Sequence, residues 1–281
     1  MTVSCINTTP LHSPTGKARG TLPFGFFRQR GKLQALHSSA ALVVNFFEYW
    51  RTRSVQAVAE ACGAPRDSYK MNFEVKHANA LGRIPSHLDV VFTGTPESKP
   101  LAIESKFTEC YQRHTRRSLA RGYLSKPGLW RELPGCETLA QRLREEEGQI
   151  TSFAYLDAPQ LLKHTLGLAT TYPTGFTLLY LWYGIKSPEA SQHWKEIIEF
   201  ESYVKDEIDF RVMTYQELFS RVAGLKGIDR NYIQYLKTRY FTEKYNSFLD
   251  EMLAAEDKYG VSVSKSLMGP EPRARKKLGR P

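Results

Sequence analysis

Cysteine is scarce in this sequence and forms no metal-binding pattern. The 281 residues contain four cysteines, Cys5, Cys62, Cys110 and Cys136. None of them has the C-x-x-C spacing of a structural zinc site. Widely spaced cysteines of this kind are typical of reduced thiols in the cytoplasm. The sequence therefore argues against a zinc module and favours a cytoplasmic protein.

Long apolar runs and an apolar N-terminal segment are also missing. No stretch approaches the roughly 20 apolar residues that a membrane span needs. The first residues are rich in Ser, Thr, Pro and Gly, unlike the apolar core of a secretory signal. We expect a protein that neither crosses a membrane nor is secreted.

Acidic residues are too few to balance the basic ones. The chain has 39 lysines and arginines against 29 aspartates and glutamates, a formal net charge of +10. A basic excess of this size favours a polyanionic partner, with nucleic acid ahead of an anionic membrane. A role in solubility alone is the alternative.

The apolar residues concentrate between two polar ends. Residues 1–31 lack periodicity and are expected to be disordered, and residues 266–281 form a basic tail that cannot pack a core. The tail either contacts phosphates or is only solvated. Residues 32–265 contain no linker that would divide them, so we expect one domain.

Hydrophobic periodicity predicts the elements of this domain. A helix is expected from Ala40 or Ala41, followed by helical residues 55–61. Strands are expected at residues 73–76, 88–92, 101–107, 175–183 and 210–214, and further helices at 139–147, 158–168, after Thr214 and at 232–249. The order is helix, three strands, helix, strand, helix, strand, helix. It predicts an α/β fold with a mixed central sheet flanked by helices.

Two carboxylates and a lysine are expected to meet on this sheet. Glu104 and Lys106 are two residues apart on one predicted strand, so their side chains share a face, and Ser105 points the other way. Asp89 opens the preceding strand and reaches the same face if the two strands form a hairpin. Charged residues in a strand as apolar as this one need a partner or a task, which argues against a simple surface ion pair.

The three side chains suit metal-assisted hydrolysis of a phosphodiester. Asp89 and Glu104 supply the oxygen ligands that Mg²⁺ prefers, and Mn²⁺ is a possible substitute. Such an ion polarises a phosphate oxygen and activates a bound water. Lys106 can orient that water or stabilise charge in the transition state. The acid-x-Lys pattern occurs four times in the chain, but only here does it follow a strand-borne aspartate.

The motif and the order of elements resemble the PD-(D/E)xK nuclease superfamily. The matching residues are Ser86-His87-Leu88-Asp89 and Ile103-Glu104-Ser105-Lys106, with Leu88 in place of the usual proline. The superfamily's α-β-β-β-α-β core would cover roughly residues 38–185. Three segments are similar to a bacterial family of restriction endonucleases. They are the helix containing Asn45-Phe46-Phe47-Glu48, the segment from Ile103 to Glu109 and the segment from Gln160 to His164.

This resemblance implies further site residues. Glu48 would supply an extra acid from the first helix, or lie on a solvated helix face. Gln160 would contact phosphate or the lysine. The alternatives are that it caps a helix or lies at an exposed position without a role in the site. Glu109 would orient Lys106 or a metal-bound water, or lie at the surface. His164, one turn after Gln160, is more often structural than catalytic.

Basic residues crowd the segment that follows the motif. The residues expected to contact DNA phosphates are Arg113, Arg116, Arg117, Arg121 and Lys126, with Tyr111, Tyr123 and Trp130 interleaved. A solvated loop is the alternative.

These patterns together predict a metal-dependent DNA endonuclease, with a role in restriction or phage defence. The alternatives are a catalytically silent nucleic-acid-binding module on the same fold, an RNA-directed nuclease and a basic scaffold protein. Many nucleases of this class cut both strands as dimers, so a homodimer is possible, but no self-complementary surface is evident in the sequence.

Overall fold

The computed structural model describes residues 39–241, except 79–80, 82–84, 115–117 and 147–152. Both expected disordered ends therefore lie outside the described residues. The same holds for Arg116 and Arg117 and for the last part of the final expected helix. No described helix is both long enough and apolar enough to cross a membrane.

A five-stranded mixed sheet forms the centre of the molecule, with the strands in the order β1-β2-β3-β4-β5. The strands are β1 (Lys70–His77), β2 (Ser86–Thr93), β3 (Leu101–Lys106), β4 (Thr177–Trp182) and β5 (Asp209–Thr214). The first three strands pair antiparallel, and β3, β4 and β5 pair parallel. The predicted α/β fold with a mixed sheet is confirmed.

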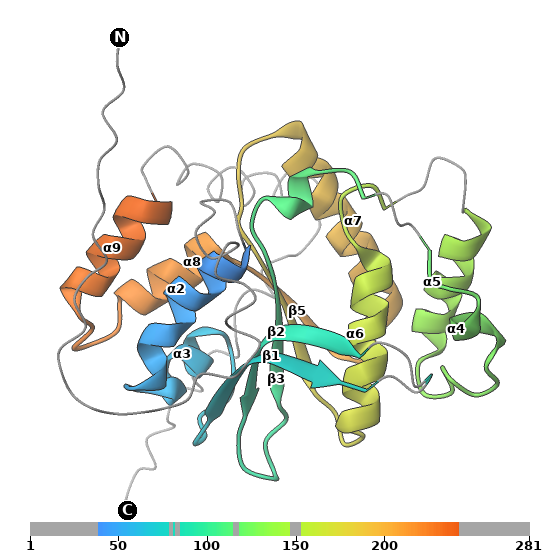
Figure 1. Ribbon diagram of the computed structural model, residues 1–281, viewed down its shortest axis with the longest axis horizontal. Coiled ribbons are helices and arrows are strands. Elements are labelled where there is room, and N and C mark those ends of the chain that lie inside the picture. The colour runs from blue at the N-terminus through green and yellow to red at the C-terminus, as the bar shows by residue number, and fades with distance from the viewer. Residues whose placement is uncertain (1–38, 79–80, 82–84, 115–117, 147–152, 242–281) are drawn as a thin grey trace, which may run out of the picture.

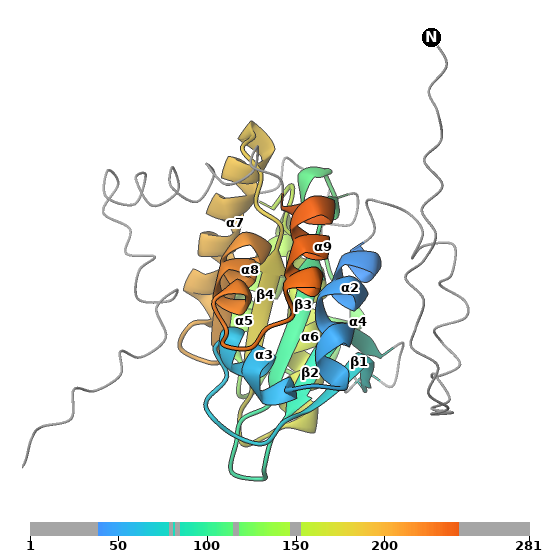
Figure 2. The ribbon, with the colours of Figure 1, turned by 90° about the vertical axis from the view of Figure 1, so that its left-hand side faces the viewer.

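Helices cover both faces of this sheet (Figure 1). One layer contains α2 (Ser39–Arg51), α3 (Val55–Ala61), α8 (Tyr215–Ala223) and α9 (Arg230–Tyr240), which lie in front of the sheet in Figure 2. The other contains α5 (Pro134–Glu145), α6 (Ala158–Thr171) and α7 (Pro188–Val204). Two short helices, η2 (Glu109–Tyr111) and α4 (Gly122–Ser125), follow β3. Each face of the sheet thus has its own hydrophobic core.

The alternation of β3 places its polar residues. Leu101 and Ile103 belong to the core under α2, whereas Ala102 belongs to the core under α6. Since successive side chains point to opposite faces, Glu104 and Lys106 continue the Ala102 side toward α6. The parity argument from the sequence is therefore confirmed.

In β1 and β2 the regular alternation of side chains between the two faces of the sheet is interrupted at the same pair of positions. Phe73 packs with the core under α2, but Val75 packs with the core under α6. Between them Glu74 has φ +51°, a left-handed conformation that is uncommon for a residue with a side chain. The register places Asp89 opposite Glu74, where the regular pairing of the two strands is interrupted. Asp89 therefore lies within β2 and not at its start, because the strand begins at Ser86.

Most predicted boundaries shift by a few residues. The helix expected at 139–147 is α5, which begins at Pro134, where a missing N–H is tolerated. Thr214 caps α8 as expected, accepting a hydrogen bond from Glu217 N at 3.1 Å. The final helix begins at Arg230 after the N-cap Asp229.

Gly167 allows α6 to approach the β1–β2 end of the sheet. A Cβ at this position would lie 2.5 Å from Ser86 Oγ and 3.0 Å from His77 Cβ. We expect Gly167→Ala to destabilise the fold by about 1–3 kcal/mol, because the overlap exceeds the gain in helix propensity. Urea unfolding measures the change. Gly224→Ala is the control, since a Cβ there would meet nothing closer than 3.5 Å. Equal stability of both variants with the wild type would contradict the close approach.

Candidate active site

The C-terminal end of β3 carries a buried ion pair. Lys106 Nζ lies 2.7 Å from Glu104 Oε1, and the side chains are 14% and 3% exposed, respectively. Because the residues are two apart on one strand, the backbone itself holds them side by side. Charges this deeply buried require compensation by their neighbours.

Helix α6 supplies that compensation from across the sheet face. Gln160 Oε1 accepts a hydrogen bond from Lys106 Nζ at 2.8 Å. One turn later, His164 Nε2 lies 3.0 Å from Glu104 Oε2. Residues four apart share a helix face, so a single helix contacts both members of the ion pair. Of the sequence alternatives, the structure favours Gln160 as the partner of the lysine and gives His164 a place beside the acid.

Asp89 joins this group through the backbone of β3. Its Oδ2 accepts a hydrogen bond from Ser105 N at 2.7 Å. The hydroxyl of Ser105 lies on the other face of the sheet, 2.7 Å from the hydroxyl of the buried Tyr215. The structure therefore brings together Asp89, Glu104 and Lys106, as the hairpin predicted, and supports them from both faces.

The electrostatics of the cluster separate its two acids. Burial and the nearby Glu104 carboxylate raise the pKa of Asp89 well above its usual range. Burial acts against ionisation of Glu104 as well, but Lys106 and His164 outweigh it and hold its pKa at about 2. Burial similarly opposes the charge of Lys106, yet Glu104 raises the pKa of this amine, which therefore stays protonated. With both carboxyls ionised, two carboxylates and one ammonium would leave one uncompensated negative charge, and this repulsion is what raises the pKa of Asp89 beyond the effect of burial.

This charge balance fits a divalent cation. An ion between Asp89 and Glu104 would remove the repulsion that raises the pKa of Asp89. Within the described ranges, no three acidic, histidine or cysteine side chains converge as a complete ion cage. Asp89 and Glu104 are the two carboxylates that could hold such an ion, and Mg²⁺ usually takes only one or two protein carboxylates together with waters and substrate phosphate.

Glu48 and Glu109 make local contacts. Glu48 Oε2 lies 3.0 Å from Arg51 Nε on the same helix, and burial raises the pKa of Glu48. Glu109 accepts a hydrogen bond from Phe107 N at 2.9 Å. Among the described residues, Glu48 makes no hydrogen bond or ion pair with Asp89 or Glu104. Its role as an extra acid stays a prediction, and the Glu109 contact is that of a turn-stabilising residue.

The basic segment after β3 is only partly as expected. Arg113, Arg121 and Lys126 are exposed, and Arg113 lies 5.8 Å from the ring centre of Tyr155. Tyr123 and Trp130, however, are buried, and Trp130 Nε1 donates to the Tyr123 carbonyl at 2.7 Å.

The mixture of basic and aromatic residues that the sequence assigned to an exposed phosphate-binding loop is therefore not exposed as a whole, because Tyr123 and Trp130 lie in the core. Their large apolar area stabilises the core under α4 and α5 instead. Tyr111 is half-buried, and its hydroxyl donates to the carbonyl of Tyr183.

Three supporting residues were missed by the sequence reasoning. Asp157 is the N-cap of α6 and accepts from Gln160 N at 2.9 Å. The pattern Asp-Ala-Pro-Gln could have indicated this cap, because an acid followed by an early proline often begins a helix. Ser105 and Tyr215 are 110 residues apart, and nothing local in the sequence predicts their contact.

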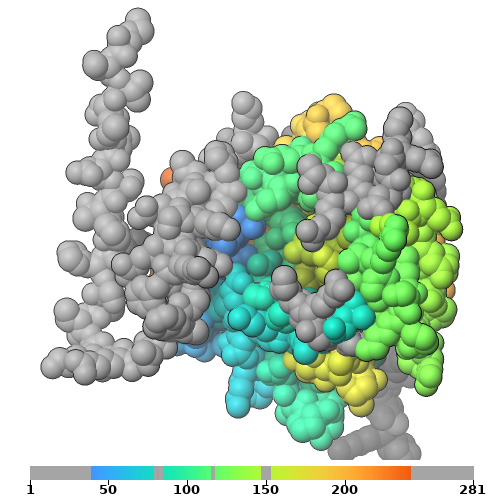
Figure 3. Space-filling model, turned by 45° about the vertical axis from the view of Figure 1, so that its right-hand side comes forward, coloured from blue at the N-terminus to red at the C-terminus, as the bar shows by residue number. Residues whose placement is uncertain are grey.

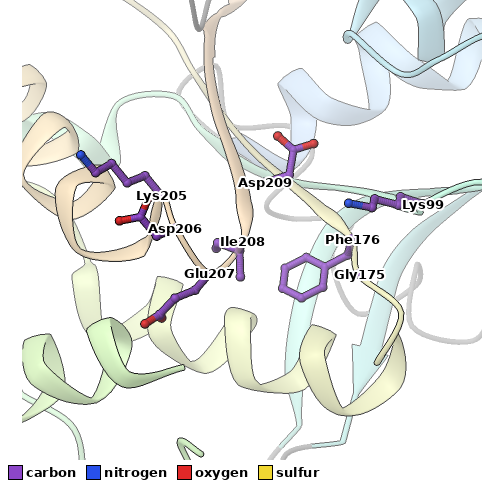
Figure 4. A pocket seen from close by; sticks show the side chains of 8 residues that line it. All are labelled: Lys99, Gly175, Phe176, Lys205, Asp206, Glu207, Ile208 and Asp209. Carbon is purple, nitrogen blue, oxygen red and sulfur yellow. The ribbon is translucent and has the colours of Figure 1, made fainter. Parts of the chain in front are cut away.

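The elements that carry the cluster meet on one side of the molecule. Figure 3 shows β1 and β2 in cyan, the segment after β3 in green and α6 in yellow around an indentation of the surface. A separate pocket of about 330 Å³ lies at the opposite end of the parallel strands. It is lined by residues just before β3, β4 and β5 (Figure 4). Its Asp209 is already paired with Arg211 at 2.6 Å, and none of its lining belongs to the cluster.

The fold and the cluster define a restriction-endonuclease-like protein. The sheet topology, the acid-x-Lys pair on β3 and the aspartate on β2 are the features of that class. A model of the family described as "Restriction Endonuclease associating with ARP" matches residues 26–241, and the chain belongs to this family. No curated protein and no solved structure matches the chain. The family assignment confirms the resemblance to restriction endonucleases and indicates a nuclease.

Proposed function

We propose that this chain is a metal-dependent nuclease that hydrolyses phosphodiester bonds of DNA, with a role in restriction or phage defence. The observation that supports this most is the buried Glu104–Lys106 pair, held by Gln160 and His164 beside Asp89. A purely structural ion pair would not need a second, electrostatically disfavoured carboxylate next to it.

Mg²⁺, or Mn²⁺ in its place, would be held by Asp89 and Glu104. When bound, it would polarise the scissile phosphate and lower the pKa of a water ligand. The oxygen of the attacking water forms a new bond to phosphorus and gives up a proton to solvent, while the bridging oxygen leaves with the electron pair of the broken bond and takes up a proton from solvent. Lys106 remains protonated, so it acts as a hydrogen-bond donor and positive charge toward the phosphate oxygens and not as a base.

The direct test is incubation of the purified full chain with plasmid, linear duplex, single-stranded DNA and RNA, with and without Mg²⁺. We expect metal-dependent cleavage of DNA. Cleavage of RNA alone would replace the proposed substrate, and binding without cleavage under every condition would favour a catalytically silent module.

Binding of DNA is expected to weaken steeply with salt. Arg113 and Arg121 are exposed on the segment that follows the catalytic strand. Replacing both with glutamine should reduce the slope of log K against log salt by about 0.9 for each lost phosphate contact. Fluorescence anisotropy at several salt concentrations measures this slope. Arg230→Gln, an exposed change on α9, is the control. An unchanged slope in the double variant would place the phosphate contacts elsewhere, with the basic tail as the next candidate.

A further inference from the structure

A buried carboxylate on α7 has no place in the chemistry described so far. Glu196 is 0% exposed. Its Oε1 accepts from Ala154 N at 3.0 Å and from Gln192 Nε2 at 3.2 Å. Its Oε2 accepts from Tyr155 N and Leu156 N, both at 2.8 Å. One side chain thus binds three consecutive backbone N–H groups of a segment that has no regular structure.

The same segment is fixed on its other side. His114 N donates to the carbonyl of Ala154 at 2.8 Å, and His114 Nε2 lies 2.7 Å from the carbonyl oxygen of Tyr155. The carbonyls of Ala154 and Tyr155 therefore face His114 in the chain that follows β3, and the N–H groups of residues 154–156 face α7. The hydrogen bonds that the Glu196 carboxylate accepts are charge-assisted. Hydrogen bonds of this kind are shorter and stronger than those between neutral groups.

Residues 154–156 lead directly into the catalytic helix. The next residue is Asp157, the N-cap of α6, and Gln160 lies in the first turn. Gln160 then contacts Lys106, and His164 contacts Glu104. An unbroken series of contacts connects Glu196 with the two central charges of the site.

The position of the first turn of α6 controls the geometry of the ion pair. Helix α6 is the source of both contacts that orient the ion pair, so a shift of its first turn moves Gln160 away from the lysine. A displacement of about 1 Å at a reacting group can cost about 100-fold in rate. An apolar side chain at position 196 would fill the space but leave the N–H groups of residues 154–156, of which that of Leu156 is buried and the other two are partly buried, without acceptors.

We propose that Glu196 is a positioning residue of the active site, which acts through residues 154–156 and Asp157 on Gln160 and His164. This inference rests on the proposed function. Glu196 does not touch the reacting atoms; it fixes the start of α6 and thereby the geometry around Lys106 and Glu104.

The test compares two variants of Glu196 with a matched control. Glu196→Gln keeps the shape but replaces one acceptor with a donor, and Glu196→Met removes both acceptors. Glu199→Gln makes the same change one turn later on α7, at a residue that pairs with Arg142. We expect Glu196→Gln to lower the single-turnover cleavage rate about tenfold or more with little change in DNA affinity. The control should retain the wild-type rate. If Glu196→Met fails to fold, Glu196→Gln decides the matter.

A double-mutant cycle separates positioning from general loss of stability. If Glu196 acts through Gln160, the combination of Glu196→Gln with Gln160→Ala should be clearly faster than the product of the two single effects. Independent, multiplicative effects would overturn the proposal.

Hydrogen exchange provides a readout without activity. In Glu196→Gln, exchange should accelerate at residues 154–161 but not in β3 or β4. Unchanged exchange in that segment would also overturn the proposal. If the wild type cuts no nucleic acid, the proposed function fails, whereas the exchange result still tests the contact.

Discussion

Replacing Lys106 with methionine is expected to lower the single-turnover cleavage rate by about 100- to 1000-fold. The variant keeps most of the aliphatic stem but removes the ammonium that lies 2.7 Å from Glu104 and 2.8 Å from Gln160. The lost interaction strengthens mainly in the transition state, so DNA affinity should change little. Calorimetric titration should show that the divalent ion still binds, since both carboxylates remain. Cleavage and titration together separate a catalytic lysine from a metal-holding residue.

Lys76→Met is the matched control for this experiment. Lys76 follows Glu74 in the same acid-x-Lys pattern, but it is exposed on β1. Its replacement should leave the cleavage rate unchanged. If Lys106→Met cuts normally and Lys76→Met does not, the catalytic pair has been assigned to the wrong strand.

The strand that carries the candidate site could be predicted from the sequence because its signals are local. Parity alone places Glu104 and Lys106 on one face, and the Pro-flanked turn before β3 predicts the hairpin that brings Asp89 near. The face to which they point could not be predicted. It depends on which helix covers that side, and this is decided by packing between residues far apart in the chain.

Residues that support the site were harder to find for a similar reason. Ser105 stands among apolar residues in the sequence, which gives no sign of a polar partner. Its hydroxyl nevertheless contacts Tyr215, which belongs to a helix far away in the chain. For the aromatic residues after β3 the sequence was misleading in the opposite sense, because it suggested a functional surface where the structure has a core. Tyr123 and Trp130 stand among basic residues, a composition that nucleic-acid surfaces and ordinary helical cores share. Composition could not distinguish the two, whereas burial does.

Asp89→Asn is expected to have opposite effects on stability and activity. Burial and Glu104 raise the pKa of Asp89, so its ionised form destabilises the metal-free protein. The asparagine oxygen can still accept from Ser105 N, and the charge is gone. We expect the metal-free variant to be about 1–3 kcal/mol more stable than the wild type at neutral pH. Cleavage should fall about 1000-fold, because a metal-holding charge is lost.

The pH dependence of this stability difference has a defined sign. A carboxyl whose pKa is raised in the folded state binds more protons there than in the unfolded chain. The stability of the wild type therefore falls as pH rises from the unfolded pKa of Asp89, 3.8, through its raised value in the folded protein. The advantage of Asp89→Asn should therefore be small near about pH 4 and largest above the folded pKa. Glu104 has a pKa of about 2 in the folded protein, so its contribution has the opposite sign and is lost as pH falls from 4.5 toward that value. It is present in both proteins and largely cancels.

Divalent ions should reverse the order of the two proteins. Binding to the folded wild type alone adds about 4.1 kcal/mol when the free ion is at about 1,000 times its Kd, which exceeds the expected advantage of Asp89→Asn, and the variant should gain much less. Urea unfolding with and without Mg²⁺ measures both effects. Asp206→Asn, an exposed change at the opposite end of the sheet, is the control and should follow the wild type in both conditions. If Asp89→Asn is destabilised without metal, or gains as much from Mg²⁺ as the wild type does, Asp89 is a structural acid and the ion has other ligands. A crossing of the two stabilities on addition of Mg²⁺ would mean that this site holds a charge which the fold disfavours and the metal requires.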